Sequence, residues 1–406
     1  MAIGSNLMVR AQRRLKRDLD WVTKRLLRSI PMAQASTLEG ANWREIFPAE
    51  TFEMARPAAL NDNDWAVFQS AMKPAVPAAR LIDLNDAFVF GEDSWIFDSR
   101  GVGVLGMWDR QGRMTEKQRI YALGDVSLAR LENAERLAGV TLVLNQVVAG
   151  NFYHFVNQIM PRLAIAAQAI DLNAIDHFIT PPNTHAFMYD LLGFAGVDAA
   201  KIRPMNEAGY RCERLIATSN PGPFLVPPKW ANDYLRSIVP EAPSPVKSKR
   251  IFLARIDALK RRLINHDEIE KLLTGYGFEH VMLDGRPFVD QAAIFRDAEL
   301  IVAVHGATLS HLIFAKPGTR VIELLPKNHV QPCFWTIGQM EGHHYSIILG
   351  SEKPLLVPKW RLDVDADLTI DPAELKAEVE KAIAVLHTRA PKSVERRHRG
   401  GNRRSC

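Results

Sequence analysis

The chain has 406 residues and a formal net charge of +5, with 47% hydrophobic and 24% charged residues. This length favours two domains, and the ordinary glycine and proline content excludes a repeat protein or a disordered chain. The longest apolar runs, at 300–304 and 347–349, are far shorter than the ~20 residues that a membrane span requires. The composition therefore predicts a soluble globular protein.

Positive charge is concentrated at the two ends of the chain. Residues 1–30 hold eight Lys/Arg and two Asp, residues 389–406 hold seven basic residues and one Glu, and the remainder is mildly acidic. This distribution argues against a nucleic-acid-binding domain, which carries its charge on a folded face. Two interpretations stay open: solvated, partly disordered ends, or attraction to an anionic membrane surface.

The N-terminal basic residues alternate with apolar residues at helical spacing, namely Leu15, Leu19, Val22 and Leu26. This pattern predicts a basic amphipathic helix that lies on a membrane or packs on the protein. It lacks the uninterrupted apolar segment of a secretory signal. The three cysteines are far apart and odd in number, so they indicate neither a disulfide framework nor a metal cluster. We therefore expect a cytoplasmic location, with peripheral contact at the inner membrane as the alternative.

Residues 36–80 are rich in Pro, Ala and Asn and are expected to be irregular, and short strands are predicted at 87–90, 94–97 and 102–107. From residue 139 strands alternate with helices, which is typical of a parallel sheet covered on both faces. The elements expected there are strands at 140–148, 177–180 and 214–218 and helices at 151–170, 186–195 and 230–239.

The proline-rich stretch 220–249 indicates a domain boundary. A second α/β series follows, with strands at 250–253, 278–283, 300–304, 320–325 and 345–349 and helices at 267–276, 289–297, 307–315 and about 372–386. Gly277 is expected to end one helix, and Asp371 with Pro372 to begin the last. Two doubly wound domains in tandem place a cleft between the carboxyl ends of two parallel sheets, where such folds bind ligands.

Two motifs imitate well-known sites. Gly101, Gly103 and Gly106 match a dinucleotide-binding pattern, but no helix is expected after them, so we assign them to a β-hairpin region. The triplet 62–64, Asp-Asn-Asp, resembles a metal-binding Asp-x-Asp, but it precedes a helical pattern, and Asp62 or Asp64 is expected to cap that helix. The alternating acids at 363, 365 and 367 are expected on the surface.

One strand-to-helix turn has the features of an anion site. An apolar strand runs into His305, Gly306 and Ala307 and then directly into a helix. Small residues let an anion approach the backbone, and a helix N-terminus offers free N–H groups and a positive dipole end. The alternative is a tight turn with a histidine that is satisfied by the protein itself.

Two neighbouring segments favour the anion site. The loop 255–265 leaves the first strand of this series with several cations, and guanidinium groups pair bidentately with phosphate oxygens. Glu323 stands within an apolar strand, where a carboxylate needs a partner, and the vicinal diol of a ribose is one natural partner.

Together these residues resemble glycosyltransferase family 61. The donor-side positions that carry the resemblance are Arg255, Asp257, Arg261, Arg262, Asn265, Gln291, His305, Gly306, Ala307, Pro317, Gly318 and Glu323. The segment 151–163, Asn-Phe-Tyr-His-Phe-Val-Asn-Gln-Ile-Met-Pro-Arg-Leu, resembles the family's N-terminal motif and includes Asn151, Gln158 and Arg162 on the acceptor side. The resemblance covers roughly half of the chain, about 140–330. Three positions depart from the family pattern: Gln158 replaces an acidic residue, His266 a Glu, and His311 an Asn.

The resemblance implies an α/β fold with two Rossmann-like domains facing a cleft, the GT-B arrangement. It also implies inverting transfer of a hexosyl or pentosyl group from a nucleotide-diphosphate donor to a glycan, polysaccharide or lipid-linked acceptor, with no metal or cofactor. Bacterial members of capsular or exopolysaccharide type are the expected subgroup. The predicted organisation is a basic amphipathic helix at 1–35, an acceptor-side domain at 36–235 that is Rossmann-like from about 139, a nucleotide-sugar-binding domain at 250–350, a helix at 370–388 and a disordered basic tail at 389–406.

Inverting transfer needs a base for the acceptor hydroxyl and positive charge for the departing diphosphate. His154 is the predicted base because an imidazole has a suitable pKa, although a capping or positioning role is the alternative. Because Gln158 cannot act as a base, a catalytically silent homologue that binds a nucleotide sugar or glycan in an assembly complex is a second hypothesis. A phosphate-binding α/β enzyme of other chemistry is a third.

Overall fold

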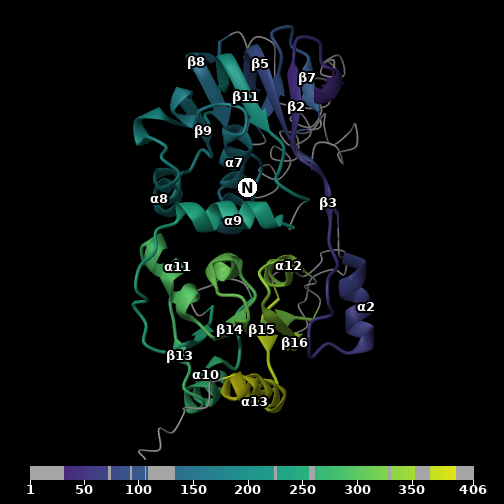
Figure 1. Cartoon of the computed structure of the whole chain (residues 1–406), viewed down its shortest axis with the longest axis vertical. Coiled ribbons are helices and arrows are strands. Elements are labelled where there is room, and N and C mark those ends of the chain that lie inside the picture. Colours follow the sequence, from purple (N-terminus) through teal and green to yellow (C-terminus); the bar gives the residue numbers. More distant parts are fainter. Residues whose placement is uncertain are drawn as a thin grey trace, which may run out of the picture.

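The computed structural model describes residues 32–71, 75–91, 94–105, 107, 133–223, 226–255, 261–327, 331–352 and 366–389. The expected basic helix and basic tail lie almost entirely outside these residues. Two sheets are separated along the longest axis by a double layer of helices, and further helices lie beyond the second sheet (Figure 1). No helix among the described residues is both long and apolar enough to cross a bilayer.

The first sheet has nine strands: β1 (Met32–Gln34), β2 (Asn42–Phe47), β5 (Ala79–Phe90), β6 (Trp95–Phe97), β7 (Gly103–Leu105), β8 (Glu135–Val143), β9 (His177–Thr180), β10 (Ile202–Pro204) and β11 (Tyr210–Thr218). Its order is β1-β7-β6-β5-β11-β8-β9-β10, with β2 also paired to β5. The strands β11, β8, β9 and β10 are parallel, while β5 runs antiparallel to β11. Chain order along the sheet reverses at β8 and β11, which makes their carboxyl ends a topological switch point.

The segment after β8 is helical but not uniformly α-helical. It consists of α6 (Phe152–His154), a π-helical turn η3 (Phe155–Ile159) and α7 (Pro161–Ala167), which together match the helix predicted at 151–170. Pro161 has no N–H to donate and its ring crowds the carbonyl four residues earlier, so the preceding turn widens. In that wide turn the Met160 N–H donates to the Phe155 carbonyl at 3.0 Å.

The second sheet has six strands: β12 (Arg250–Leu253), β13 (Glu279–His280), β14 (Leu300–Val304), β15 (Arg320–Pro326), β16 (His344–Glu352) and β17 (Leu368–Thr369). Its order is β13-β12-β14-β15-β16-β17, and all pairs are parallel except β16 with β17. Here the switch point lies between β12 and β14. Every residue of β14 is buried, as expected for a strand covered on both faces.

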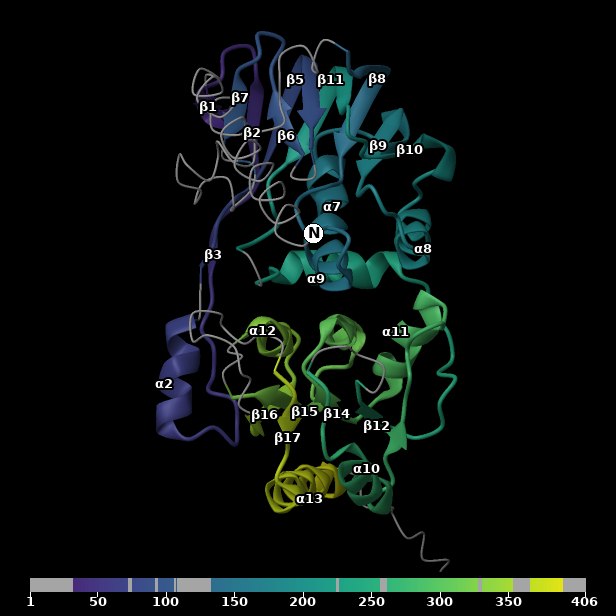
Figure 2. The ribbon, with the colours of Figure 1, turned by 180° about the vertical axis from the view of Figure 1, so that it is seen from behind.

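Helices cover both faces of the second sheet. The helices α10 (His266–Gly275) and α13 (Pro372–Arg389) lie on the outer face (Figure 2). The face toward the first sheet carries α11 (Phe288–Asp297), the 3₁₀ helix η6 (Ala307–Phe314) and α12 (Cys333–Met340). Opposite them lie α8 (Ala186–Phe194) and α9 (Lys229–Ile238) of the first unit. Hydrogen bonds join the two layers, including Asn157 Nδ2 to Ser310 Oγ at 2.9 Å and Asn232 Nδ2 to Glu341 Oε1 at 2.9 Å.

The prediction that 36–80 is irregular is wrong. Besides β2, the segment forms β3 (Glu50–Thr51), β4 (Ala75–Val76) and α2 (Asp62–Ala71), and α2 lies beside the second sheet (Figures 1 and 2). Ala58 forms a β-bridge with Ser346, and Trp65 packs edge-on against Trp335 with ring centroids 5.8 Å apart. Part of the segment assigned to the first domain therefore packs on the second unit.

The cap of α2 also differs from the expectation. Neither Asp62 nor Asp64 caps the helix, because the Asn61 side chain accepts the Asp64 N–H at 2.9 Å. The remaining end signals are as predicted: Gly277 has φ +79° after α10, and the Asp371 carboxylate accepts the Ala373 N–H at 2.8 Å. Gly103 pairs with Phe97 in the expected hairpin, whereas Gly106 lies outside the described residues.

Several elements differ from the prediction in length or type. The strand expected at 278–283 is limited to β13, so the chain leaves the sheet early and Val281–Gly285 is free to line a pocket. The helix after the His-Gly-Ala turn is a 3₁₀ helix. The strand β8 begins five residues earlier than the predicted start at 140 and ends at Val143. The domain boundaries themselves stay predictions.

His311 lies fully buried between the two helix layers. Its ring packs against Phe152 of the first unit and Phe288 and Phe295 of the second, with centroids 5.1 to 5.3 Å apart. Its Nδ1 lies 2.9 Å from the Thr308 carbonyl oxygen. Burial lowers the pKa of His311 from 6.5 to about 4. His311 is therefore a neutral histidine of the core.

This burial predicts an acid-sensitive fold. Between pH 6.5 and about 4 the unfolded chain binds a proton at His311 that the folded chain does not, so the free energy of unfolding falls as the pH falls. A shift of this size corresponds to roughly 3 kcal/mol across that window. Urea unfolding of wild type and His311→Leu at pH 7 and pH 4.5 measures the effect. In the variant, the free energy of unfolding should fall less between pH 7 and pH 4.5, by the amount that one bound proton accounts for. The same fall in wild type and variant would contradict this account.

Candidate functional site

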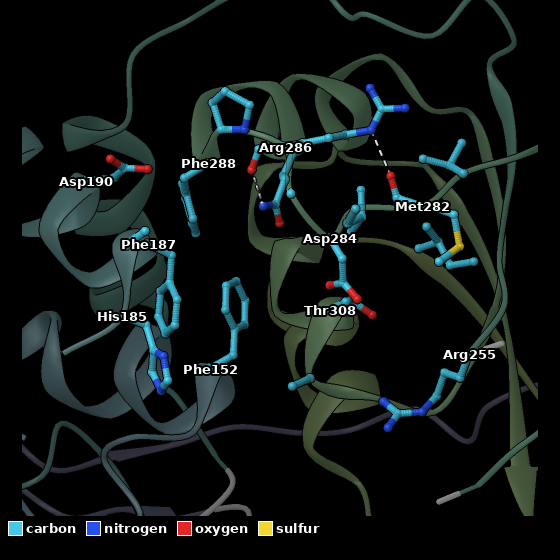
Figure 3. Close-up of a pocket in the computed structure, with 18 of the residues that line it drawn as sticks. Phe152, His185, Phe187, Asp190, Arg255, Met282, Asp284, Arg286, Phe288 and Thr308 are labelled. Atoms are coloured by element: carbon cyan, nitrogen blue, oxygen red, sulfur yellow. Dashed lines mark hydrogen bonds between the residues drawn. The ribbon is translucent and has the colours of Figure 1, made fainter. Parts of the chain in front are cut away.

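A cavity of about 910 Å³ opens beside the switch point of the second sheet (Figure 3). One wall comes from the first unit, at Phe152 and the start of α8, and the other from the carboxyl ends of β12 and β13 and the starts of α11 and η6. Its lining residues are Gly150, Phe152, 185–187, Asp190, 253–255, 281–288, Gln291, Ala307 and Thr308. This volume is in the range of pockets for cofactor-sized ligands.

Arg255 is one of two arginines that line this cavity, the other being Arg286. Arg255 follows β12 directly, and its guanidinium points into the cavity (Figure 3). Burial, and next the like charge of Arg261, lower the pKa of Arg255. Its Nε is buried and has no hydrogen-bond partner among the described residues. A half-buried guanidinium whose buried Nε is an unused donor favours an anionic ligand.

The start of η6 lies across from Arg255. Ala307 and Thr308 line the cavity, and their helix begins directly after Gly306. The first N–H groups of a helix lack intrahelical partners and attract anions. The arginine, the glycine turn and the helix start therefore meet at one place, as the sequence predicts.

Gly306 is needed for close approach and not for backbone conformation. Its φ of −175° is extended and suits any residue. A Cβ at this position would lie 2.1 Å from Arg255 Nη1, so the guanidinium occupies the space of the missing side chain.

Gly306→Ala is expected to weaken binding of a nucleoside diphosphate roughly tenfold, because the guanidinium must swing away from its position and loses part of a charge-assisted pair. The free energy of unfolding should change little, since a flexible side-chain end can move. Calorimetric titration and urea unfolding measure the two quantities. Gly193→Ala on α8, where a Cβ meets no atom within 4 Å, is the matched control. Unchanged affinity in Gly306→Ala would show that the observed Arg255 position does not matter.

Asp284 is a site residue that sequence analysis missed. It follows β13, the second strand of this doubly wound unit, and its carboxylate lines the cavity (Figure 3). In nucleotide-binding folds of this type, a carboxylate after the second strand accepts hydrogen bonds from ribose hydroxyls. The Asp-Gly pair at the end of a predicted strand was the available signal.

Aromatic rings form the wall opposite Asp284. Phe152 lies 4.8 Å from Phe187 and 6.0 Å from Phe288, and His185 stacks on Phe187 at 6.0 Å. The group combines side chains of both units, so no local motif reveals it. Flat rings of this kind suit a nucleobase or sugar face.

Gln291, one of the expected donor-side residues, lines the cavity from α11, but its amide is partly engaged. Its Nε2 donates to the Arg286 carbonyl at 2.8 Å, and Arg286 Nε donates to the Met282 carbonyl at 2.7 Å (Figure 3). These bonds hold the loop 282–287 at the rim.

The expected contact of Glu323 with a ribose is not what the structure shows. Glu323 is fully buried, its Oε1 lies 2.5 Å from His305 Nδ1, and its Oε2 accepts the Tyr345 hydroxyl at 2.9 Å. Neither His305 nor Glu323 lines the cavity. Because both carboxylate oxygens have protein partners, Glu323 orients His305 behind the turn. Burial, and next the Glu323 charge, raise the pKa of Tyr345, so its hydroxyl remains a donor.

The remaining residues of the cationic loop have mainly protein partners. Arg262 forms a two-point ion pair with Asp367, at 2.7 and 3.1 Å. The Asn265 amide donates to the Ile370 carbonyl at 2.8 Å and accepts the Ile370 N–H at 3.1 Å. Arg261 adopts φ +57° and acts on Arg255 through its charge. Arg262 borders a smaller cavity of about 320 Å³ together with Arg255. Asp257 lies outside the described residues.

The acceptor-side residues form a hydrogen-bonded chain. Asn151 caps α6 by accepting the Tyr153 N–H at 2.9 Å. Arg162 Nη2 donates to Gln146 Oε1 at 2.6 Å, and Gln146 Nε2 donates to Gln158 Oε1 at 2.6 Å. That same Gln158 oxygen lies 2.8 Å from His154 Nδ1. Arg162 and Gln158 are buried, so they position other groups and do not face a ligand.

This series of hydrogen bonds determines which ring nitrogen of His154 carries the proton. A Gln158 oxygen that accepts from Gln146 is also an acceptor for His154, so Nδ1 carries the proton and Nε2 is the basic nitrogen. Burial lowers the pKa of His154, while the bond to Gln158 acts in the opposite direction. His154 does not line the large cavity, but its neighbours Phe152 and Tyr153 connect it to both units: Phe152 lines that cavity and Tyr153 packs edge-on against Phe334 at 5.6 Å.

Part of the chain is similar to known glycosyltransferases. Residues 152–322 match the family model described as Glycosyltransferase 61, which is less than half of the chain. EGF domain-specific O-linked N-acetylglucosamine transferase from Mus musculus is 30% identical over 114 residues, 27% of this chain and 21% of that protein. Its Drosophila melanogaster counterpart is 29% identical over 111 residues, 26% of this chain and 21% of that protein. Beta-1,2-xylosyltransferase from Arabidopsis thaliana is 27% identical over 100 residues, 21% of this chain and 19% of that protein.

The matched segment spans the acceptor-side helix, the cationic loop and the His-Gly-Ala turn, and the comparisons support the resemblance to glycosyltransferase family 61 there. The chain covers about a fifth of the length of these relatives. They come from animals and a plant, so the bacterial capsular type stays a prediction.

Proposed function

We propose that the chain is an inverting glycosyltransferase that moves a sugar from a nucleotide-diphosphate donor to a glycan or polysaccharide acceptor without a metal. The observation that carries the proposal is the meeting of Arg255, Gly306 and the start of η6 in one cavity at the switch point of a parallel sheet. The similarity of residues 152–322 to glycosyltransferase family 61 supports the same reaction class.

Different parts of the cavity suit the diphosphate, the ribose and the base or sugar of such a donor. Arg255 and the N–H groups at 307–308 would bind the diphosphate and stabilise its charge as it leaves. Asp284 would accept hydrogen bonds from the ribose, and the rings of Phe152, Phe187 and Phe288 would contact the base or sugar. Positive charge from these groups replaces the metal that other sugar transferases use for the diphosphate.

His154 is the proposed base for the acceptor hydroxyl. Its neutral imidazole, with Nδ1–H held by Gln158, offers Nε2 as the proton acceptor. Inversion follows if the acceptor oxygen attacks the anomeric carbon from the face opposite the diphosphate while His154 takes the proton. A polysaccharide or lipid-linked acceptor, a cytoplasmic location and peripheral contact with an anionic membrane complete the proposal.

A nucleotide-sugar panel tests this function. Donors of several nucleotides and sugars are compared first by thermal shift, since a bound ligand stabilises the folded chain by mass action. The best donor is then incubated with glycan acceptors, and the anomeric configuration of the product is read by NMR. Transfer with inversion is the expected result, and retention of configuration would overturn the mechanism.

The silent-homologue alternative rests on Gln158, whose amide cannot ionise. It predicts donor stabilisation with no turnover on any acceptor and no release of nucleotide diphosphate. A third function, other chemistry on a phosphate ligand, predicts that no nucleotide sugar raises the melting temperature.

A further inference from the structure

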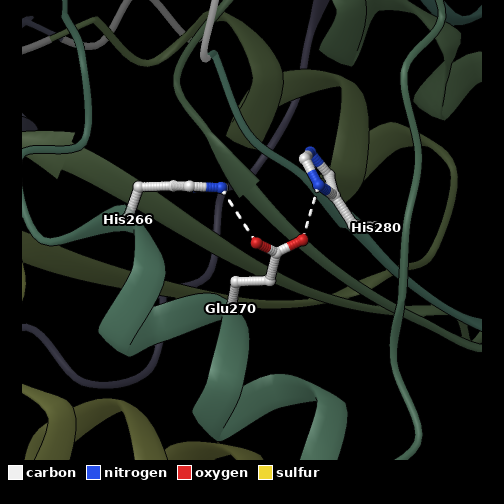
Figure 4. A group of neighbouring side chains, drawn as sticks. All are labelled: His266, Glu270 and His280. Carbon is white, nitrogen blue, oxygen red and sulfur yellow. Dashed lines mark hydrogen bonds and ion pairs between the residues drawn. The ribbon is translucent and has the colours of Figure 1, made fainter.

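Three potential metal ligands converge on the outer side of the second sheet, apart from the donor cavity (Figure 4). His266 is the first residue of α10, Glu270 lies one helical turn later, and His280 ends β13. His266 Nε2 is 3.2 Å from one Glu270 oxygen, and His280 Nδ1 is 2.8 Å from the other. None of the three residues lines the larger cavity.

The three side chains are arranged so that their ligand atoms face one another. The two imidazole nitrogens and the carboxylate oxygen lie within 4.8 Å of one another. Phe252 supports both rings, with centroids 5.9 Å from His266 and 5.5 Å from His280. The outward nitrogens, His266 Nδ1 and His280 Nε2, are buried without a hydrogen-bond partner among the described residues. The orientation of both histidines is therefore set by the packing on Phe252 and by the contacts with Glu270, and not by hydrogen bonds of the outward nitrogens within the described residues.

Two imidazoles and one carboxylate are the ligand types that zinc prefers, and three protein ligands leave a fourth position for water. The ligands are also close in sequence, so little chain entropy is lost in bringing them together. His266 and Glu270 share a helix face at spacing i,i+4, and His280 follows ten residues later. The Glu270 side chain is 37% exposed, which gives an ion access from solvent.

We propose that His266, Glu270 and His280 bind a zinc ion. The ion replaces the two His–Glu hydrogen bonds with three coordination bonds and joins the start of α10 to the end of β13. Because His266 follows the loop that carries Arg261, Arg262 and Asn265, the ion also anchors the end of that loop. The proposed role of the ion is to hold this helix, strand and loop together, and its binding does not depend on the proposed transfer reaction.

The full chain is first dialysed against a chelator and then titrated with zinc in a calorimeter. We expect binding of one ion per chain and a rise in melting temperature that grows with zinc concentration. His266→Ala and His280→Ala should each weaken zinc binding roughly 100-fold or more, because each removes one of three ligands. His387→Ala, an exposed histidine on α13, is the matched control and should bind zinc as wild type does. Mg²⁺ at equal concentration should not shift the melting temperature, because it prefers oxygen ligands.

Cobalt provides a readout that does not depend on any variant folding. Co²⁺ bound by two imidazoles, one carboxylate and water in tetrahedral geometry should give strong visible absorption, which zinc then displaces. Glu270→Gln keeps the size of the side chain and should lose this band. The proposal is overturned if wild type gives no such band, or if both histidine variants bind zinc as tightly as the control.

Discussion

His154→Ala is expected to lower the transfer rate by about 10²- to 10⁴-fold, the usual contribution of a positioned general base. Donor affinity should stay within about twofold of wild type, since His154 is not part of the donor cavity. Burial lowers the pKa of His154 and so keeps the imidazole neutral near neutral pH, while the hydrogen bond of Nδ1 to Gln158 leaves Nε2 as the proton acceptor. Steady-state transfer and calorimetric donor binding measure the two effects separately.

The pH profile of wild type adds an independent check. Because burial lowers the pKa of His154, the rate should fall only on the acid side, at a pH below the ordinary histidine value. His177→Ala, whose ring lies near the Ala138 carbonyl in the first sheet, is the control histidine. Should His154→Ala retain the wild-type rate, the base would have to be another residue; should it lose donor binding as well, its role would be positional.

Arg162→Leu is expected to lower the free energy of unfolding by about 3–5 kcal/mol, the cost of removing one partner from a buried, charged hydrogen-bond network. The guanidinium is fully buried where the carboxyl ends of β8 and β11 meet, and burial lowers the pKa of Arg162 to about 9. It donates to the Asn145 carbonyl, to the Gln146 side chain and to the Asn220 side chain at 2.6 to 3.2 Å. Leucine leaves these acceptors buried and unsatisfied.

Urea unfolding of Arg162→Leu and Arg214→Leu makes the comparison direct. Arg214 is also an arginine of the first unit, but its side chain is 42% exposed and pairs with Asp83, so its loss should cost no more than about 1 kcal/mol. Arg162→Leu should also lower the transfer rate, because the hydrogen bonds through Gln146 and Gln158 no longer hold His154 in place. Equal stability of the two variants would show that Arg162 does not hold the switch point together.

Buried parallel strands were the elements that could be predicted best from the sequence. The strands at 177–180, 250–253 and 300–304 match the structure to the residue, because strands covered on both faces are apolar runs with clear ends. The helix α2 was expected from the pattern that follows the triplet 62–64, but its packing on the second unit was missed because it depends on distant partners. Trp65 meets Trp335, and that partner is not visible in a local pattern.

The site residues that could be predicted from the sequence belong to local patterns, and those that could not depend on distant partners. Arg255, Gly306 and Ala307 were found because a strand-to-helix turn and a cationic loop are local patterns. Glu323 and Asn265 were expected to bind the ligand, but their side chains form hydrogen bonds with residues of other elements, Tyr345 and Ile370. Asp284 and the aromatic wall were missed because separate elements of both units contribute to one cavity.

Binding of a nucleoside diphosphate to wild type and to Arg255→Ala tests the central claim, that the cavity at the second switch point is the donor site. Calorimetry should show binding to wild type that weakens roughly 10- to 100-fold in Arg255→Ala, the loss expected for one charge-assisted, two-point contact with phosphate. Arg203→Ala, an arginine on β10 outside both cavities, should bind as wild type does. Equal affinity of wild type and Arg255→Ala, with both chains folded, would contradict the assignment of this cavity as the donor site.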